Sequence, residues 1–405
     1  MVILRVKLDI LVDEIKIIMR ELHQNMHFYD TRSTRYSASS SIENFQKAEK
    51  IEVFIAYIMH YKSDLFRRAP SRRAETFAFD CTNLSSVFIP YDFFEYSCGN
   101  RQVFFYDYQR YSLNLQMFVN LLHVQNSEHK TAIWIRDQMG SYGNTPTHLL
   151  TDDKLSNSTK ENINLFVNTL RSTLTKVEHE KKLKVLIKKT NTKFRDYNNY
   201  IDEIFDKYGD LSFVCVELSL GAKGFNTTTL GNAAIFEADS PCINLAEFKD
   251  KFLNNARNVD PLSRMVGYIG KWEWSVIKCG LYFRIIFIFP TSELGDMNAL
   301  QHEINFYWCE KITFGHGLCH HAPIAVAPAK FKKPYCHIKK SNVKEREAFK
   351  ERAVGYITKS EKFYYPVELK NLLNSLKTEK VSERELSLTF RSKSKKNKLT
   401  LASKK

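Results

Sequence analysis

The sequence lacks any uncharged stretch that is long enough to cross a bilayer. It also lacks a secretory signal, because the opening residues MVILRVKLDILVDEIKIIM are interrupted by charge too often for an apolar signal core. Their pattern is typical of an amphipathic strand or helix. Together these absences predict a cytoplasmic protein with no membrane partner.

Several chemical motifs are also absent. None of the eight cysteines forms a C-x-x-C pair, so we expect reduced and mostly buried thiols in a reducing compartment. The glycines of SLGAKGFN (219–226) lack the spacing and the following helix of a phosphate-binding fingerprint. No internal repeat is visible. The sequence therefore predicts neither a disulfide scaffold nor a nucleotide-binding loop.

Acidic residues are too few to balance the basic ones. The chain of 405 residues has 60 Lys and Arg against 45 Asp and Glu, a net charge of +15, with 43% hydrophobic residues. Such a composition predicts a globular protein of two or three domains with an anionic partner, and favours nucleic acid over a membrane. A role of the charge in solubility alone is the alternative.

The excess of positive charge is greatest at the C-terminus. The last 30 residues contain ten Lys and Arg against three acids. A run such as RSKSKKNK does not fold alone, so a solvated tail is one interpretation and a phosphate-binding tail is the other. The candidate nucleic-acid-binding residues of this run are Arg391, Lys393, Lys395, Lys396 and Lys398.

Changes in pattern divide the chain into four parts: an N-terminal segment and linker (1–41), a mixed domain of unknown role (42–193), an α+β domain (194–365) and the basic tail (366–405). In the mixed domain, helical patterns are predicted at 42–68, 109–124 and 160–190, the last of which ends in the basic run EKKLKVLIKK. An aromatic, strand-like segment covers 76–108.

The α+β domain shows the clearest pattern. A helix is predicted from 194 to a stop at Gly209, followed by a buried strand at 211–220. A helix at 245–255 with Asn244 as its N-cap precedes two strands, MVGYIGKWEWSV and LYFRIIFIF. A helix capped by Asp296, the loop TFGHGLCHH and a last helix at 345–363 complete the domain. This order predicts helices packed on an antiparallel sheet.

Arg284 interrupts the apolar run KCGLYFRIIFIF and needs a partner, since a guanidinium does not lose its proton when it is buried. In a hairpin that turns near 277–280, Glu273 lies on the same sheet face as Tyr282 and Arg284. With Lys278–Cys279 as the turn, Glu273 is directly opposite Arg284. We therefore expect an ion pair between Glu273 and Arg284.

A second candidate site lies on the last helix, where Tyr356 and Lys359 are three residues apart and share a face. A tyrosine near a cation can act as a phenolate nucleophile on a phosphodiester. The simpler interpretation of Y-x-x-K is an ordinary surface pair.

The order VCVELSL, VGYIGKWEW, HEINFYW, TFGHG and the Y-x-x-K helix resembles the inovirus replication-initiator-like proteins of bacterial prophages, the YagK/YfjJ group. The resemblance covers about residues 195–365. It implies a divergent relative of rolling-circle initiators of the His-hydrophobe-His class, with a ferredoxin-like fold whose helices lie on one face. It also implies an origin or single-stranded DNA partner, a metal ion held by two histidines, and a nicking tyrosine.

Carried over to this chain, the resemblance makes Tyr356 the nucleophile, Lys359 its companion and Glu273 the acid that precedes the histidine strand. The histidine pair is missing, because the strand reads Gly280-Leu281-Tyr282-Phe283-Arg284 where the family has G-x-H-x-H. A fixed positive charge at Arg284 repels a divalent cation. The chain is thus expected to bind no metal and no other cofactor, unless nickase activity with Mg²⁺ or Mn²⁺ is retained.

Three functions remain open: a degenerate, non-catalytic DNA-binding relative, an active tyrosine nickase, or a protein-interaction module that uses residues 76–108. The position of Tyr356 relative to Arg284 distinguishes the first two. Zinc binding by the HGLCHH loop is a lesser alternative, because its spacing matches no standard site. Trp272, Trp274 and Trp308 are predicted to pack in the core rather than stack on bases.

Overall fold

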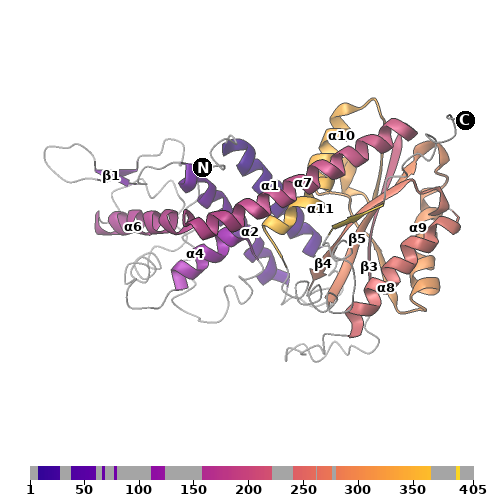
Figure 1. Cartoon of the computed structure of the whole chain (residues 1–405), viewed down its shortest axis with the longest axis horizontal. Coiled ribbons are helices and arrows are strands. Elements are labelled where there is room, and N and C mark those ends of the chain that lie inside the picture. The colour runs from indigo at the N-terminus through magenta and orange to yellow at the C-terminus, as the bar shows by residue number, and fades with distance from the viewer. Residues whose placement is uncertain are drawn as a thin grey trace, which may run out of the picture. The chain divides into compact units, whose positions relative to one another are not determined.

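The computed structural model describes residues 8–27, 38–60, 66–68, 77–79, 111–123, 157–220, 240–260, 262–275, 280–365 and 389–392 (Figure 1). The chain divides into two compact units. Unit 1 comprises Met1–Thr190 with Lys359–Tyr365, and unit 2 comprises Asn191–Thr358 with Pro366–Lys405.

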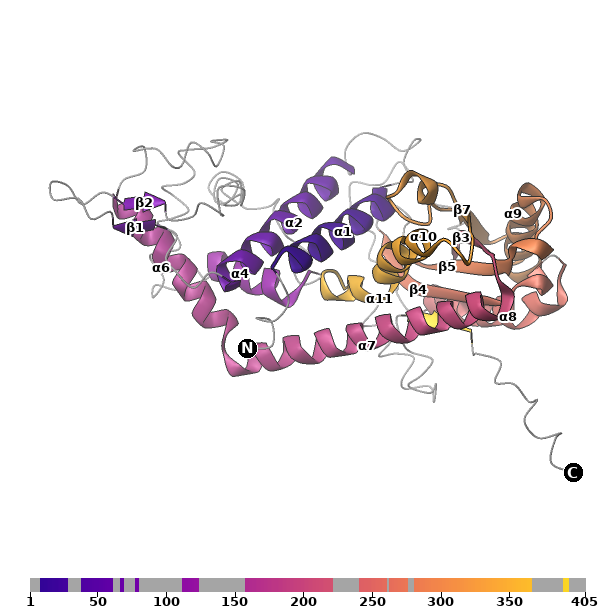
Figure 2. The ribbon, with the colours of Figure 1, turned by 90° about the horizontal axis from the view of Figure 1, so that it is seen from above.

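Unit 1 is a group of helices: α1 (Leu8–His27), α2 (Ala38–His60), α4 (Leu113–His123), α6 (Asn157–Leu174) and the first part of α7 (Val177–Tyr208). Helices α1 and α2 run side by side (Figure 2). The ring of Phe118 lies edge-on to Phe54 and Phe166, at centroid distances of 6.4 and 5.7 Å, which joins α2, α4 and α6 in one core.

Unit 1 differs from the sequence prediction in two boundaries. The helix predicted at 42–68 ends at His60, and residues 66–68 form strand β1 (Phe66–Arg68), which pairs with β2 (Phe77–Phe79). The residues predicted as a polar linker up to position 41 include the first turn of α2, which begins at Ala38. Apart from β2, the predicted aromatic segment 76–108 lies outside the described residues.

Unit 2 is built on an antiparallel sheet in the order β6–β3–β5–β4–β8. Its central strands are β3 (Leu211–Leu220), β4 (Gly267–Ser275) and β5 (Gly280–Pro290), with β6 (Gly317–His321), β7 (Tyr335–Ile338) and β8 (Thr389–Arg391) outside them. Strand β7 pairs with β3 beyond the end of β6. With α8 (Ser240–Asn255) and α9 (Met297–Phe306), the order β3–α8–β4–β5–α9–β6 forms a ferredoxin-like arrangement. The predicted α+β class is confirmed.

Helices cover both faces of this sheet (Figure 1). Helices α8 and α9 lie on one face, as expected for this arrangement, and Phe252 of α8 packs 5.9 Å from Phe287 of β5. The other face, which was predicted to be free of helices, carries α7 and α10 (Val343–Phe349), and Phe349 packs 4.1 Å from Phe213 of β3. Every residue of β5 from Leu281 to Pro290 is therefore buried.

Two predicted helix ends are confirmed. Helix α7 ends at Tyr208, and Gly209 follows with φ of +77°, a left-handed conformation that glycine adopts without strain. Asp296 caps α9 by accepting a hydrogen bond from the backbone amide of Asn298 at 3.0 Å.

Three other predictions are wrong. Asn244 is inside α8 rather than at its N-cap, since the helix begins at Ser240. The glycine-containing loop TFGHGLCHH is largely strand β6, because the edge of β3 satisfies the backbone of residues 317–321. The basic tail is not solvated along its whole length, since β8 pairs with β4 and both Thr389 and Ser392 are buried.

Candidate functional site

A cluster of charged and phenolic side chains lies on the sheet face that also receives Tyr356. All of its members are buried, with at most 8% of each residue exposed. Glu217 is on β3, Lys271 and Glu273 are on β4, and Tyr282 and Arg284 are on β5. The sixth member, Tyr356, is on α11 (Gly355–Lys359). Two acids and two bases balance, so the cluster carries no net formal charge.

The hairpin register differs from the expected one by two residues. Glu273 lies opposite Tyr282, and Lys271 lies opposite Arg284. Strand β5 already begins at Gly280, so the strands are joined by residues 276–279 rather than by a turn at Lys278–Cys279. Because the shift is even, Glu273 stays on the face of Arg284, as predicted.

Arg284 pairs with Glu217 rather than with Glu273. Its neighbour across β3 is Glu217, and Nη1 donates a hydrogen bond to Glu217 Oε1 at 2.9 Å. Nη2 donates to the carbonyl of Pro323. Arg284 and Glu217 are only 1% and 2% exposed, so this is an ion pair of the protein interior. The predicted partner was therefore wrong, although a carboxylate was correctly required.

The second acid, Glu273, is held by its own strand and by α11. Its Oε1 accepts a hydrogen bond from the Tyr356 hydroxyl at 2.6 Å and lies 3.2 Å from the Lys271 ammonium. Burial raises the pKa of Glu273, but the charges of Lys271 and Arg284 and hydrogen bonds from Tyr282 and Tyr356 outweigh it and lower the pKa to about 2. Glu273 is thus ionised at neutral pH.

Tyr356 is a hydrogen-bond donor in this arrangement. Burial raises the pKa of its phenol well above the usual value and the Glu273 carboxylate raises it further, while Arg284 opposes them. Two cations face its ring, with Lys271 Nζ 4.4 Å and Arg284 Cζ 5.6 Å from the ring centroid. The side chain is 3% exposed, and its proton points at a carboxylate. A phenolate nucleophile is therefore disfavoured in the folded state.

The structure thus brings Tyr356 next to Glu273 and Arg284, a position that the sequence left open. The predicted companion Lys359 forms an ion pair with Glu14, with Nζ 2.8 Å from Oε2. Glu217 was missed as a functional residue. The sequence did indicate it, because Glu217 is the single acid in the apolar run VCVELSL and a buried carboxylate needs a basic partner.

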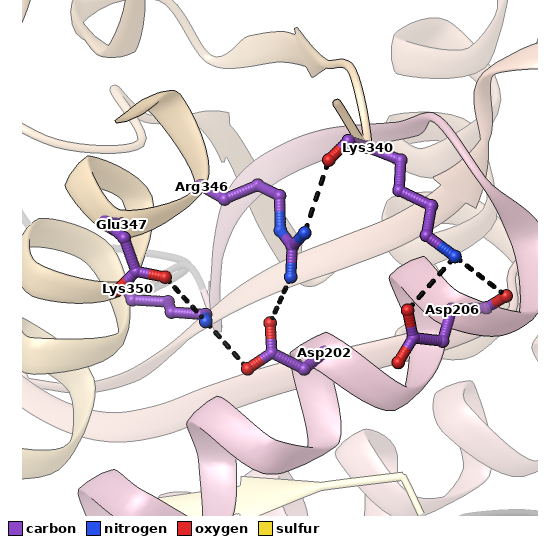
Figure 3. Close-up of polar contacts among 6 residues, drawn as sticks. All are labelled: Asp202, Asp206, Lys340, Arg346, Glu347 and Lys350. Atoms are coloured by element: carbon purple, nitrogen blue, oxygen red, sulfur yellow. Dashed lines mark hydrogen bonds and ion pairs between the residues drawn. The ribbon is translucent and has the colours of Figure 1, made fainter. Parts of the chain in front are cut away.

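A polar network fixes the helical segment that leads to Tyr356 (Figure 3). Asp202 of α7 accepts hydrogen bonds from Arg346 Nη2 at 2.6 Å and from Lys350 Nζ at 2.7 Å. Beside them, Lys340 Nζ lies 3.0 Å from Asp206 Oδ1. Residues 343–362 are helical without interruption, so anchoring Arg346 and Lys350 also positions Tyr356, which follows Lys350 by between one and two turns.

The tail residue Arg391 is exposed, and its guanidinium lies 4.9 Å from the ring centroid of Tyr200. The other predicted nucleic-acid-binding residues, Lys393, Lys395, Lys396 and Lys398, lie outside the described part of the chain. Arg391 thus combines an exposed cation with a fixed aromatic support.

The predicted zinc ligands have other environments. On β6, the ring Nε2 of His321 is 3.1 Å from the carbonyl oxygen of Gln301. Among the described side chains, no group of three His, Cys, Asp or Glu is arranged to hold a metal ion. Trp272 and Trp308 are buried and face Phe283, each at a centroid distance of 5.3 Å, which confirms their predicted core packing.

Comparisons with known proteins provide no relative for this chain: no family model, no curated protein and no solved structure matches it. None of the described helices is long and apolar enough to cross a membrane. The functional interpretation therefore depends on the residues and their geometry.

Proposed function

We propose that this protein binds DNA in a replication-associated role, as a non-catalytic relative of prophage rolling-circle initiators. The observation that carries the proposal is the Arg284–Glu217 ion pair, 2.9 Å long and buried in the sheet face where the resemblance places a metal ion. In such a protein, an internal guanidinium supplies the positive charge that a metal ion supplies in a nicking enzyme.

Charge and fold support the same proposal. The net charge of +15 favours a polyanion, and the ferredoxin-like strand order is the one that the resemblance implies. Tyr356 is engaged with Glu273 and buried, which suits a structural role better than attack on a phosphodiester.

A binding and cleavage assay tests the proposal. We expect the full-length chain to bind labelled single-stranded and duplex DNA with an affinity that falls steeply as salt increases, because phosphate contacts release counterions. We expect no cleavage with Mg²⁺ or Mn²⁺. Binding that is absent, or that does not depend on salt, would contradict the proposal.

The contribution of the tail is measured by removing residues 393–405. This deletion retains β8, whose Phe390 packs near Trp272 and Phe283, so unit 2 keeps its core. A cut at residue 377 would remove that strand and confuse folding with binding. We expect the shorter chain to bind DNA more weakly and with a smaller salt dependence.

One observation favours the second candidate, an active tyrosine nickase. Tyr356 faces the sheet surface that carries Arg284, with Cζ of the arginine 5.6 Å from its ring. Such an enzyme would form a covalent adduct between Tyr356 and the 5′-phosphate of the cut strand, releasing a 3′-hydroxyl. Detection of the adduct by denaturing electrophoresis, and its loss in Tyr356→Phe, would establish this function in place of the first.

A further inference from the structure

The first part of helix α7 in unit 1 presents a dense row of positive charge. Between positions 181 and 189 there are five lysines and no acid. Lys181, Lys184 and Lys188 follow each other at three and four residues, so they share one side of the helix. Lys182 and Lys189 extend this side, and all of them except the half-buried Lys184 are exposed. We call these five lysines the α7 lysine face.

Acids among the described residues pair with three of these five lysines. Lys182 and Lys184 pair with Glu178 and Glu180 one turn earlier, at 2.7 and 2.8 Å. Lys189 pairs with Glu361 at 2.6 Å. Within the described residues, neither Lys181 nor Lys188 has an acidic partner. These two lysines lie two turns apart on the same side of the helix, about 10 Å along its axis.

The opposite side of the helix decides between two kinds of anionic surface. Leu183, Leu186 and Ile187 are half-buried and lie across the helix from the lysines, and Thr190 on that side is fully buried. A helix that binds a lipid surface needs an exposed apolar side next to its cations. On the α7 lysine face the apolar exposure is limited to Val177 and Val185, without leucine or an aromatic residue. The arrangement therefore favours a water-soluble polyanion such as nucleic acid over a lipid surface.

We infer that the α7 lysine face binds the phosphate backbone of nucleic acid, with Lys181 and Lys188 as its main contacts. This inference rests on the proposed DNA-binding function and adds a surface outside the tail. Lysines contact phosphates as point charges and read no base edges, so the surface contributes affinity without sequence specificity.

The test compares the double variant Lys181→Gln/Lys188→Gln with the full-length protein by fluorescence anisotropy on a labelled duplex. Loss of two phosphate contacts lowers the slope of log affinity against log salt by about 1.8 on duplex and about 1.4 on single strands. Affinity for the duplex falls by roughly tenfold at low salt. Both side chains are exposed, so circular dichroism and the melting temperature stay unchanged.

The matched control is Lys332→Gln/Lys333→Gln, which removes the same charge from two exposed lysines of unit 2. An equal loss in this variant would mean that net charge alone matters, and would overturn the inference. Unchanged binding by the α7 variant while the full-length protein binds DNA would overturn the inference and leave the proposed function intact. No binding by the full-length protein would overturn both. Binding of the full-length protein to phosphatidylserine vesicles that the α7 variant loses, with DNA binding unchanged, would assign the surface to lipid instead.

Discussion

At the scale of single residues, the stability of unit 2 depends on the buried ion pair between Arg284 and Glu217. Removing one member of a buried ion pair leaves an uncompensated charge in the interior and costs about 3–5 kcal/mol. We expect Glu217→Ala to lower the free energy of unfolding by this amount in chemical denaturation, since Arg284 Nη1 loses the carboxylate to which it donates at 2.9 Å.

The double variant Glu217→Leu/Arg284→Met provides the control. Replacing both partners by apolar residues of similar volume removes the charge as well as its partner, so most of the lost stability returns. If the double variant were no more stable than Glu217→Ala, the destabilisation would come from packing and not from the unpaired guanidinium.

Another single residue, Glu52 of unit 1, makes stability depend on pH. Burial raises its pKa to about 7, although hydrogen bonds from Ser112 and Asn114 and the charge of Lys362 act against burial. Between pH 4.5 and 7 the folded state then holds a proton that the unfolded state releases. The contribution of Glu52 to the free energy of unfolding therefore falls by up to about 3 kcal/mol as the pH rises from 4.5 to 7.

Glu52→Gln tests this expectation, because glutamine stays neutral and keeps an oxygen that can accept the Ser112 hydroxyl. We expect melting temperatures of the variant to exceed those of the parent at pH 8 and to approach them at pH 5. A parent chain with the same pH profile as the variant would mean that Glu52 is ionised throughout.

At the scale of elements, the helical segment 343–358 is anchored to α7 by Asp202. This carboxylate accepts hydrogen bonds from Arg346 and Lys350, and the pKa of Asp202 is lowered because these bonds and charges outweigh its partial burial. We expect Asp202→Ala to cost about 1–3 kcal/mol, since Lys350 is only 6% exposed. Hydrogen exchange of the amides at 343–358 should accelerate more than that of β5.

Asp206→Ala is the control on the same helix. Its partner Lys340 is 43% exposed at the side chain, and an exposed pair contributes about 1 kcal/mol or less. Equal effects of the two variants on exchange at 343–358 would show that α10 is not held by Asp202 in particular.

The same elements show how far the sequence could be interpreted. Strands β3, β4 and β5 were predictable because they are buried apolar runs of strand length, and the face of Arg284 followed from alternation alone. The register of β4 against β5 could not be predicted, since residues 276–279 carry no turn signature that fixes the hairpin. Strand β6 escaped prediction because GLCHH becomes a strand only by pairing with β3. Glu217 escaped as a partner because β3 is distant in sequence.

At the scale of the whole molecule, each unit has its own core, and the two acids discussed above belong to different units. Glu52 is surrounded by groups of unit 1, whereas Glu217 pairs with Arg284 in unit 2. Substitutions that share no partner add within about 0.5 kcal/mol. We therefore expect the stability change of Glu52→Gln/Glu217→Ala to equal the sum of the two single changes.

The double-mutant cycle is measured by denaturation at pH 8, where the Glu52 effect is fully present because the pKa is about 7. The same cycle at pH 5 is its internal control, since Glu52 is then largely protonated and Glu217→Ala alone should account for the change. A coupling energy well above 0.5 kcal/mol at pH 8 would contradict the separation into two independent cores. It would mean that ionisation of Glu52 in the helical unit changes the stability of the sheet whose Glu273 binds Tyr356.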